Sequence, residues 1–361
     1  MGGFECATHQ RTDRLRVDVI AASGHDRMCA VDYELLQQAG VRTVRDGLRW
    51  HLVESADGVY DWSSFLPMLE ASCATGMQVI WDLCHWGVPA GLDLFSTDFP
   101  RRFAAFASAA ARIVQAHCGD AIPFYCPINE MSFWAWIGGD IGAFGPHQRG
   151  RGVEVKQQLV AASLAAMRAI RAVDPRARFV QPEPIIHVST HMPEAQDDAS
   201  RHIASQFEAW DMLRGDRHPE LGGDPGMLDV IGVNYYWDNQ WVLGGGEKTP
   251  LGHHHHRPLH LMLVELWQRY GRPILVTETG AEASAGPGWL GYISSEVRQA
   301  QRHGAQVLGI CLYPVMDYPG WDDERHCGCG LIEVQPGWGE RRLRDDLTAE
   351  MKLQATLFDP S

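Results

Sequence analysis

Two glutamates lie in short motifs that could carry out acid–base and nucleophilic chemistry. Glu130 follows Asn129 directly after one apolar segment, and Glu278 follows Thr277 after another, much later in the chain. A pair of carboxyl groups can cleave a glycosidic bond, because one protonates the leaving oxygen while the other meets the positive charge that develops on the sugar. Either glutamate alone could instead cap a helix or pair with a cation, so the hypothesis depends on the two lying together.

Only a closed fold can bring residues so distant in the sequence together, and the chain contains the strands to build one. Seven short apolar segments are each bounded by glycine, proline or a polar turn, which is typical of buried strands. They are Val41–Arg45, Gln78–Leu83, Ile122–Pro127, Arg178–Gln181, Val230–Asn234, Pro273–Thr277 and Val307–Leu312. A weaker candidate, Phe4–Ala7, lies near the start of the chain.

Segments with helical periodicity separate these strands. Large apolar side chains recur every three or four residues in 103–114 and in Val155–Ala172. Gly40, Gly76 and Gly304 each stand between a helical segment and a strand, where glycine commonly ends a helix. Strands that alternate with helices in this way indicate a parallel sheet with right-handed crossovers.

We therefore predict an α/β fold, a single (β/α)8 TIM barrel, with residues 1–361 forming one catalytic domain. A doubly wound open sheet is the alternative. It is disfavoured because no Gly-x-Gly-x-x-Gly motif follows the first strand.

Functional groups of such barrels come from the carboxyl ends of the strands. Polar residues at these positions, besides the two glutamates, are Arg45, His85, Asn234 and Tyr236. Each has a structural alternative: Arg45 could pair with Asp46, His85 could be a core imidazole, and Tyr236 could simply pack. Glu183, between two prolines, is a third carboxyl at a strand end, and we interpret it as part of the pocket wall.

The composition argues against several classes of partner. The chain has 31 Lys and Arg against 45 Asp and Glu, and its net charge of −14 disfavours nucleic acid and anionic membrane surfaces. The nine cysteines are odd in number and dispersed in apolar segments, and neither a signal peptide nor a membrane-spanning run is visible. We predict a cytoplasmic protein whose partner is a small carbohydrate, not nucleic acid or a membrane; the oligomeric state stays open.

The segment Trp237–Arg257 is long and rich in glycine, and it ends with four consecutive histidines, His253–His256. A metal site is one interpretation of this tract. Four consecutive imidazoles in a loop point in several directions, however, so we favour a solvated loop.

Taken together, the motifs resemble those of the retaining β-glycosidases of glycoside hydrolase family 1. The family's acid/base segment, Asn-Glu-Pro, is echoed by Asn129-Glu130-Met131, and its nucleophile segment, Thr-Glu-Asn-Gly, by Thr277-Glu278-Thr279-Gly280. Further matches are His85-Trp86-Gly87-Val88-Pro89, the loop Gly142–Pro146, and Asn234-Tyr235-Tyr236. The resemblance extends from about Phe4 to about Val334, nearly the whole chain.

The resemblance implies a role for each matched residue. Glu278 would be the nucleophile, held by Arg45 and Tyr236. Glu130 would be the general acid and then the general base, which requires a raised pKa. The implied substrate-binding residues are Asn129, which would donate to the sugar 2-hydroxyl, together with His85, Gln10, Asn234 and Trp321. Neither a metal ion nor an organic cofactor is implied.

The segment after the eighth strand departs from the family. Tyr313 stands where the family has tryptophan, and Gly320 stands where it has a glutamate that grips two sugar hydroxyls. Such a bidentate contact decides which sugar is bound, so its loss argues against simple glucose or galactose specificity. The neighbouring Asp322 and Asp323 could take its place.

Two other functions stay open on the sequence alone. A catalytically silent sugar-binding barrel would keep the pocket and lose the chemistry. A metal-dependent barrel hydrolase would use His85 with the His253–His256 tract and would lose activity to chelators.

Overall fold

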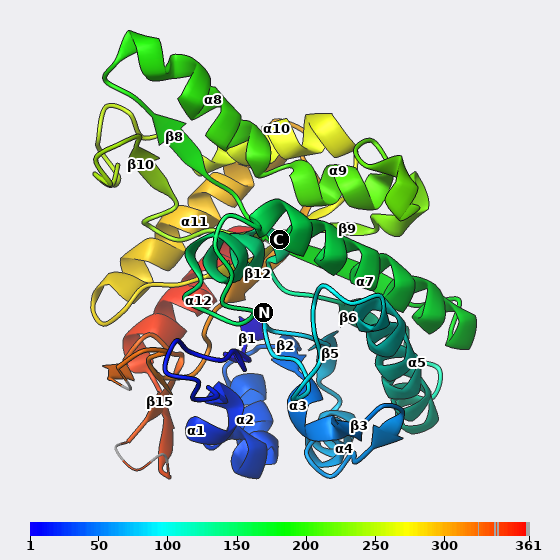
Figure 1. The fold of residues 1–361 in the computed structure, drawn as a ribbon. Coiled ribbons are helices and arrows are strands. Elements are labelled where there is room, and N and C mark those ends of the chain that lie inside the picture. Colours follow the sequence, from blue (N-terminus) through cyan, green and yellow to red (C-terminus); the bar gives the residue numbers. More distant parts are fainter. Residues whose placement is uncertain (324, 336, 338, 359–361) are drawn as a thin grey trace.

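The computed structural model describes residues 1–323, 325–335, 337 and 339–358, and its centre is a closed barrel of eight parallel strands (Figure 1). The last three residues of the predicted domain, 359–361, thus lie outside the described residues. The barrel strands are β1 (Gly2–Gly3), β2 (Thr43–Gly47), β5 (Gln78–Asp82), β6 (Phe124–Cys126), β7 (Arg178–Pro184), β9 (Val230–Asn234), β11 (Ile274–Thr279) and β12 (Val307–Leu312).

The strand order is β1-β12-β11-β9-β7-β6-β5-β2, and β1 closes the ring. It does so because Gly2 is paired both with Leu312 of β12 and with Val44 of β2. This closure confirms the predicted (β/α)8 barrel, and the open doubly wound sheet is wrong.

Seven of the predicted strands match barrel strands to within a few residues, but the first does not. The segment Phe4–Ala7 was expected to be the strand, whereas the pairing residues are Gly2 and Gly3. Phe4–Ala7 follows directly and continues alongside β2, where Phe4 N–H donates to the Arg45 carbonyl.

Helices lie around the barrel and cover its outer surface (Figure 1). The longer ones are α2 (His25–Gln38), α4 (Leu66–Thr75), α5 (Asp98–Cys118), α7 (Gly152–Val173), α8 (Gln196–Ser205), α9 (Glu208–Arg214), α10 (Leu259–Tyr270), α11 (Ala285–Arg302) and α12 (Asp345–Phe358). Short helical segments are α1 (Val19–Ala22), α3 (Trp50–Val53), α6 (Met131–Trp134), the π-helix Ala135–Ile141, and the 3-10 turns Pro193–Ala195, Pro219–Leu221 and Pro225–Met227. Among the described residues, none of these helices combines the length and the hydrophobicity needed to cross a bilayer.

The apolar core has two layers. The larger layer lies between the strands and the helices, and it includes the inward faces of α5 and α7. The smaller one fills the barrel itself with Ile80, Cys126, Val180, Val230 and Leu275. Because apolar side chains fill this interior, the polar residues of the strands are concentrated at the carboxyl end.

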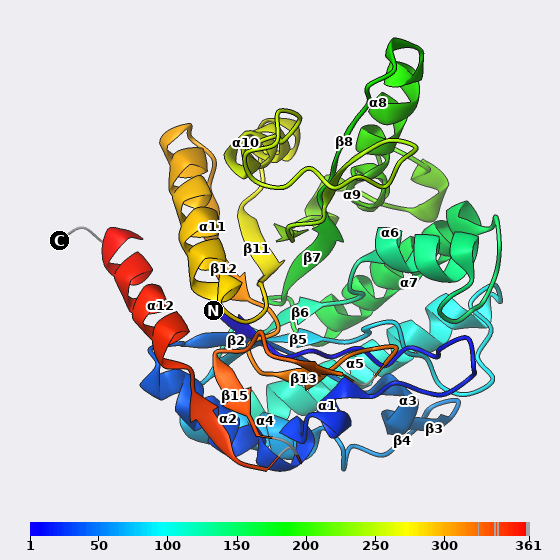
Figure 2. The same ribbon diagram turned by 90° about the vertical axis from the view of Figure 1, so that its left-hand side faces the viewer.

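Four two-stranded sheets lie outside the barrel: β3 (Glu54–Ala56) with β4 (Val59–Tyr60), β8 (His187–Ser189) with β10 (Gln240–Val242), β13 (Tyr318–Pro319) with β14 (His326–Cys327), and β15 (Ile332–Val334) with β16 (Arg341–Leu343). The β8–β10 pair is parallel and continues the chain beyond β7 and β9. In Figure 2, β8 and α8 rise away from the barrel. The segment Trp237–Arg257 was predicted to be a loop throughout, and this is wrong for Gln240–Val242, which form the strand β10.

A buried ion network ties the end of the chain to its beginning. Arg341 Nε lies 2.5 Å from Asp32 Oδ1, and Asp32 Oδ2 lies 2.8 Å from His25 Nδ1. His25 Nε2 in turn lies 2.8 Å from Asp46 Oδ2. Although burial alone would lower the pKa of His25, the two carboxylates raise it to about 9, so the imidazolium bridges them.

Candidate active site

The carboxyl ends of the barrel strands bring most of the predicted residues into one buried network. Arg45 is at its centre. Its Nη1 donates to Glu278 Oε1 at 2.6 Å, and its Nη2 donates to Asp82 Oδ2 at 2.7 Å and to Asn129 Oδ1 at 2.6 Å. Burial opposes the charge of Arg45, but Asp82 and Glu278 outweigh it and raise the pKa of the guanidinium well above its usual range.

The Glu278 carboxylate is held at both oxygens. Arg45 binds Oε1, and Tyr236 Oη donates to Oε2 at 3.0 Å. Burial and the neighbouring Glu278 charge raise the pKa of Tyr236 well above its usual range, so the phenol keeps the proton that it donates. The Arg45 cation and the Tyr236 phenol thus fix the orientation of the Glu278 carboxylate, because each donates a hydrogen bond to one of its oxygens.

A register shift in β11 sets the direction of the Glu278 side chain. Val276 is paired with Val233 of β9, but the register shifts before Glu278 pairs with Asn234. Such bulges re-direct side chains and are common beside functional sites. The Glu278 carbonyl is fixed in addition by Tyr235 N–H at 2.9 Å.

Glu130 lies at the start of α6 in a left-handed backbone conformation, with φ 46° and ψ 61°. This conformation is costly for a residue with a side chain and is concentrated at functional sites. The backbone is held in place by Glu130 N–H donating to the Pro182 carbonyl at 3.1 Å. Asn234 Nδ2 donates to Glu130 Oε1 at 2.9 Å, and Thr277 Oγ1 orients that amide by donating to Asn234 Oδ1 at 2.7 Å.

The surroundings of Glu130 favour its protonated form. Burial raises the pKa of Glu130 well above its usual range, and the Glu278 charge raises it further. A carboxyl in this setting stays protonated near neutral pH and can act as a general acid. The pair therefore consists of one acid held by a cation and another kept neutral by its surroundings.

His85 and Asn129 extend the network. His85 Nε2 lies 2.9 Å from Asn129 Nδ2, and His85 Nδ1 lies 3.0 Å from Asp82 Oδ2. These partners fit a neutral imidazole that donates from Nδ1 to the carboxylate and accepts at Nε2 from the amide. Burial would raise the pKa of Asp82, but Arg45 and His85 lower it, so Asp82 stays ionised.

Sequence reasoning missed two residues of this network, Glu5 and Asp82, and named a third, Tyr313, only as a departure from the family. The Tyr313 ring lies under the Arg45 guanidinium, 5.2 Å from its centroid, and its hydroxyl donates to Glu5 Oε1 at 3.4 Å. Burial raises the pKa of Glu5 to about 7, and the Glu278 charge acts in the same direction. Both Glu5 and Asp82 are charged residues inside an apolar segment, and this pattern could have identified them as buried polar residues.

Two predicted residues lie outside the hydrogen-bond network. Gln10 Nε2 donates to the Arg14 carbonyl at 2.9 Å, within its own loop. Trp321 packs against Trp86, with ring centroids 5.1 Å apart, and near His9 at 5.9 Å. Trp321 Nε1 and both ring nitrogens of His9 are buried and have no hydrogen-bond partner among the described residues.

The remaining acidic candidates have other surroundings. Asp322 and Asp323 are exposed, and Asp323 Oδ1 accepts from Arg325 N–H at 3.2 Å. Glu5 is thus a buried carboxyl in the region where they were expected to act. Glu183 is buried, and its two oxygens accept from Ser132 N–H at 3.0 and 3.3 Å. It therefore supports the turn that carries Glu130.

Metal-binding groups lie elsewhere. Within the described ranges, the one group of three or more His, Cys, Asp or Glu side chains that could hold an ion is His191, His254 and His255. It contains neither His85 nor either catalytic candidate, so the geometry does not favour the metal-dependent hydrolase.

Solved structures share this fold. The β-glycosidase from Thermosphaera aggregans is 16% identical with a TM-score of 0.77, covering 92% of this chain and 85% of that one. A hyperthermophilic β-glucosidase mutant that forms a dodecamer in the crystal is 17% identical with a TM-score of 0.76, covering 91% and 88%. A family 1 β-glucosidase from Thermotoga maritima is 14% identical with a TM-score of 0.73, covering 92% and 86%.

No family model matches the sequence, and no curated protein matches it either. At these identities the likeness shows that this chain has the fold of the three enzymes.

Proposed function

We propose that this protein is a retaining β-glycosidase, in which one (β/α)8 catalytic domain of residues 1–361 hydrolyses small β-glycosides or oligosaccharides. The observation that carries the proposal is the pair Glu130 and Glu278. One is a buried acid with a raised pKa, and the other is held by Arg45 and Tyr236. The fold shared with β-glucosidases supports it.

In the first step, a carboxylate oxygen of Glu278 attacks the anomeric carbon while the glycosidic C–O bond breaks. Glu130 gives its proton to the leaving oxygen, so the aglycone departs as an alcohol and the sugar is held as an ester. Esterification removes the negative charge of Glu278.

In the second step, Glu130 acts as a base. The lost charge had been raising the pKa of Glu130, so its conjugate base forms more readily in the intermediate. Glu130 takes a proton from water, the resulting hydroxide oxygen bonds to the anomeric carbon, and the ester bond breaks. Both glutamates return to their starting forms without a metal ion or an organic cofactor.

The sugar-binding residues in this proposal are those around the pair. Asn129 and His85 would contact sugar hydroxyls, and the half-buried Trp321 ring would pack against the sugar. The buried carboxyl of Glu5 beside His85 favours a neutral or amino sugar over an anionic one.

A screen of nitrophenyl β-glycosides, including amino and uronic sugars, tests the proposal. We expect turnover with at least one substrate, a loss of more than a thousandfold in Glu278→Ala and Glu130→Ala (an order-of-magnitude figure for an essential group), and partial rescue of Glu278→Ala by azide. A 2-deoxy-2-fluoro glycoside of the accepted sugar should label Glu278, as read by peptide mass spectrometry.

Near wild-type turnover in both alanine variants would contradict the proposal. Sugar binding without labelling would instead indicate a catalytically silent sugar-binding barrel. Loss of turnover with a chelator would indicate the metal-dependent hydrolase. The cytoplasmic location remains a prediction from the cysteine pattern of the sequence.

A further inference from the structure

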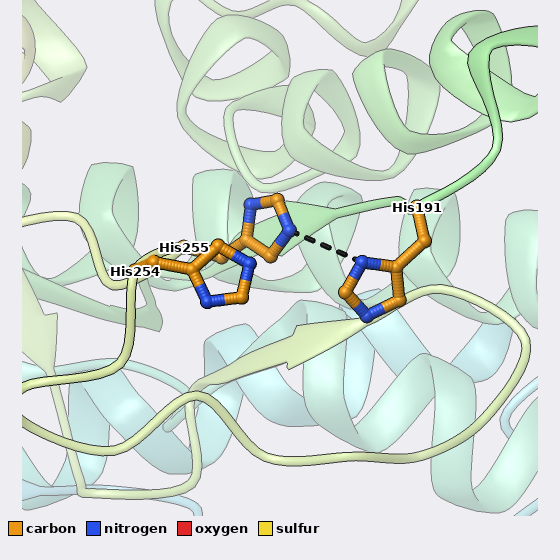
Figure 3. A group of neighbouring side chains, drawn as sticks. All are labelled: His191, His254 and His255. Atoms are coloured by element: carbon orange, nitrogen blue, oxygen red, sulfur yellow. Dashed lines mark hydrogen bonds between the residues drawn. The ribbon is translucent and has the colours of Figure 1, made fainter.

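Three histidines from two separate segments gather beside the β8–β10 sheet (Figure 3). His191 follows β8, while His254 and His255 lie in the loop between β10 and α10. Each offers one ring nitrogen, and these nitrogens all lie within 4.8 Å of one another. None of the three belongs to the network around Arg45.

We propose that His191, His254 and His255 form a zinc site that joins these two segments. His255 Nε2 and His191 Nδ1 are 3.3 Å apart. In a tetrahedral zinc site with Zn–N distances of 2.0–2.1 Å, two ligand nitrogens are ~3.4 Å apart. Two of the three ligands therefore already have the required spacing. His254 is exposed, and its ligand nitrogen lies within 4.8 Å of the ligand nitrogens of the other two histidines.

A carboxylate lies behind one of the ligands. His191 presents Nδ1 to the site, while its other nitrogen, Nε2, lies 3.7 Å from Glu247 Oε2. Metal-binding histidines typically donate their second N–H to a carboxylate, which fixes the tautomer and the ring orientation. Glu247 Oε1 is also 3.6 Å from His253 Nε2, and His253 Nδ1 accepts from His255 N–H at 3.2 Å.

The fourth histidine of the tract, His256, anchors the loop between β10 and α10 through two hydrogen bonds. His256 turns away from the others: Nδ1 donates to the Thr249 carbonyl at 2.9 Å, and Nε2 accepts from Tyr292 Oη at 3.2 Å. The expectation that the consecutive imidazoles diverge thus applies to His256, whereas His254 and His255 point toward His191.

The donor set selects the ion. Three neutral imidazoles suit zinc and its borderline neighbours, whereas magnesium and calcium require oxygen ligands. Three protein ligands leave the fourth tetrahedral position to water.

The position of the site gives zinc a stabilising role. Zinc would close the open end of the β8–β10 sheet, which extends beyond β7 and β9. Asn239 connects this sheet to the barrel, since its Oδ1 accepts from Tyr236 N–H and its Nδ2 donates to the Ile185 carbonyl, both at 2.9 Å. The inference is independent of the glycosidase proposal.

Calorimetric titration of the metal-free full chain with zinc chloride at pH 7.5 tests the site. We expect one high-affinity zinc per chain, and at least tenfold weaker binding in the double variant His254→Ala/His255→Ala and separately in His191→Ala. The matched control is His202→Ala/His303→Ala, which removes one exposed histidine of α8 and one exposed histidine just after α11 and should bind like the wild type. Glu247→Gln should weaken binding by about tenfold.

Thermal unfolding gives a second readout. At a zinc concentration one hundred times the wild-type dissociation constant, the wild type and the control should gain about 4 °C, and the double variant should gain no more than about 2 °C. Equal zinc affinity in the wild type and the double variant, or no binding by the wild type, would overturn the site. The three histidines would then be no more than a hydrogen-bonded surface cluster.

Discussion

At the scale of single residues, the burial of Glu183 makes the stability of the fold depend on pH. Burial raises the pKa of this carboxyl from its ordinary value of 4.5 to about 7, although hydrogen bonding to Ser132 partly stabilises the charge. The folded chain therefore holds this proton more tightly than the unfolded chain does between those pH values. Stability must fall as pH rises through that interval, because the native state binds more protons there.

The variant Glu183→Gln isolates this contribution. Glutamine keeps an oxygen for Ser132 N–H but has no proton to lose, so the variant should lose less stability than the wild type between pH 4.5 and 7. The difference should be about 3 kcal/mol, from 1.36 kcal/mol per pKa unit. Urea unfolding at a series of pH values measures it. Parallel curves for the two proteins would show that Glu183 titrates normally.

At the scale of elements, the close approach of β7 and β9 leaves no room for a side chain at Gly232. A Cβ at this position would lie 2.8 Å from Pro182 Cα and 2.9 Å from Pro182 N, both backbone atoms that cannot turn aside. The Pro182 carbonyl also holds the strained backbone of Glu130. The spacing of two strands and the position of an acid are thus coupled.

We expect Gly232→Ala to destabilise the fold by about 1–3 kcal/mol, the usual cost of overpacking, and to reduce turnover through the shift at Glu130. The control is Gly288→Ala in α11, where a Cβ meets nothing within 4 Å and alanine should be neutral or stabilising by up to about 1 kcal/mol. Chemical denaturation compares the two. Equal stabilities would contradict the close packing.

The elements also show what the sequence could reveal. The Gln78–Leu83 strand was predictable because an apolar segment with a polar boundary marks a buried strand, and it corresponds to β5. The strands β8 and β10 were not predictable, because segments of three residues carry no periodic signal and their pairing is non-local. Motifs identified Glu130 and Glu278. Glu5 was missed because a charge inside an apolar segment does not reveal which side of the barrel it faces.

At the scale of the whole molecule, Arg341 joins the two ends of the chain. Its guanidinium and the Asp32 carboxylate are both almost fully buried, and Arg341 Nη2 also donates to the Ser23 carbonyl at 3.1 Å. Without Arg341, the His25 imidazolium would be the cation shared by Asp32 and Asp46, so one buried negative charge would no longer be balanced, which is strongly destabilising.

Arg341→Met should therefore cost about 3–5 kcal/mol in unfolding free energy. The neighbouring Arg342 is the matched control, because it pairs with Glu333 at the surface and Arg342→Met should cost less than about 1 kcal/mol. Guanidinium-induced unfolding of both variants measures the contrast. Similar small losses in the two would mean that the Asp32 pair contributes little.

The closure of the barrel by β1 has a consequence for the order of events during folding. The network around Arg45 and Glu278 takes residues from Glu5 to Tyr313, and the ring of strands is complete only when Gly2 meets Leu312. A nascent chain therefore has no assembled pocket until the residues through Tyr313 have left the ribosome. Recovery of the pocket during refolding consequently reports the last step of ring formation, and fragments lacking either end of the chain lack part of the pocket as well.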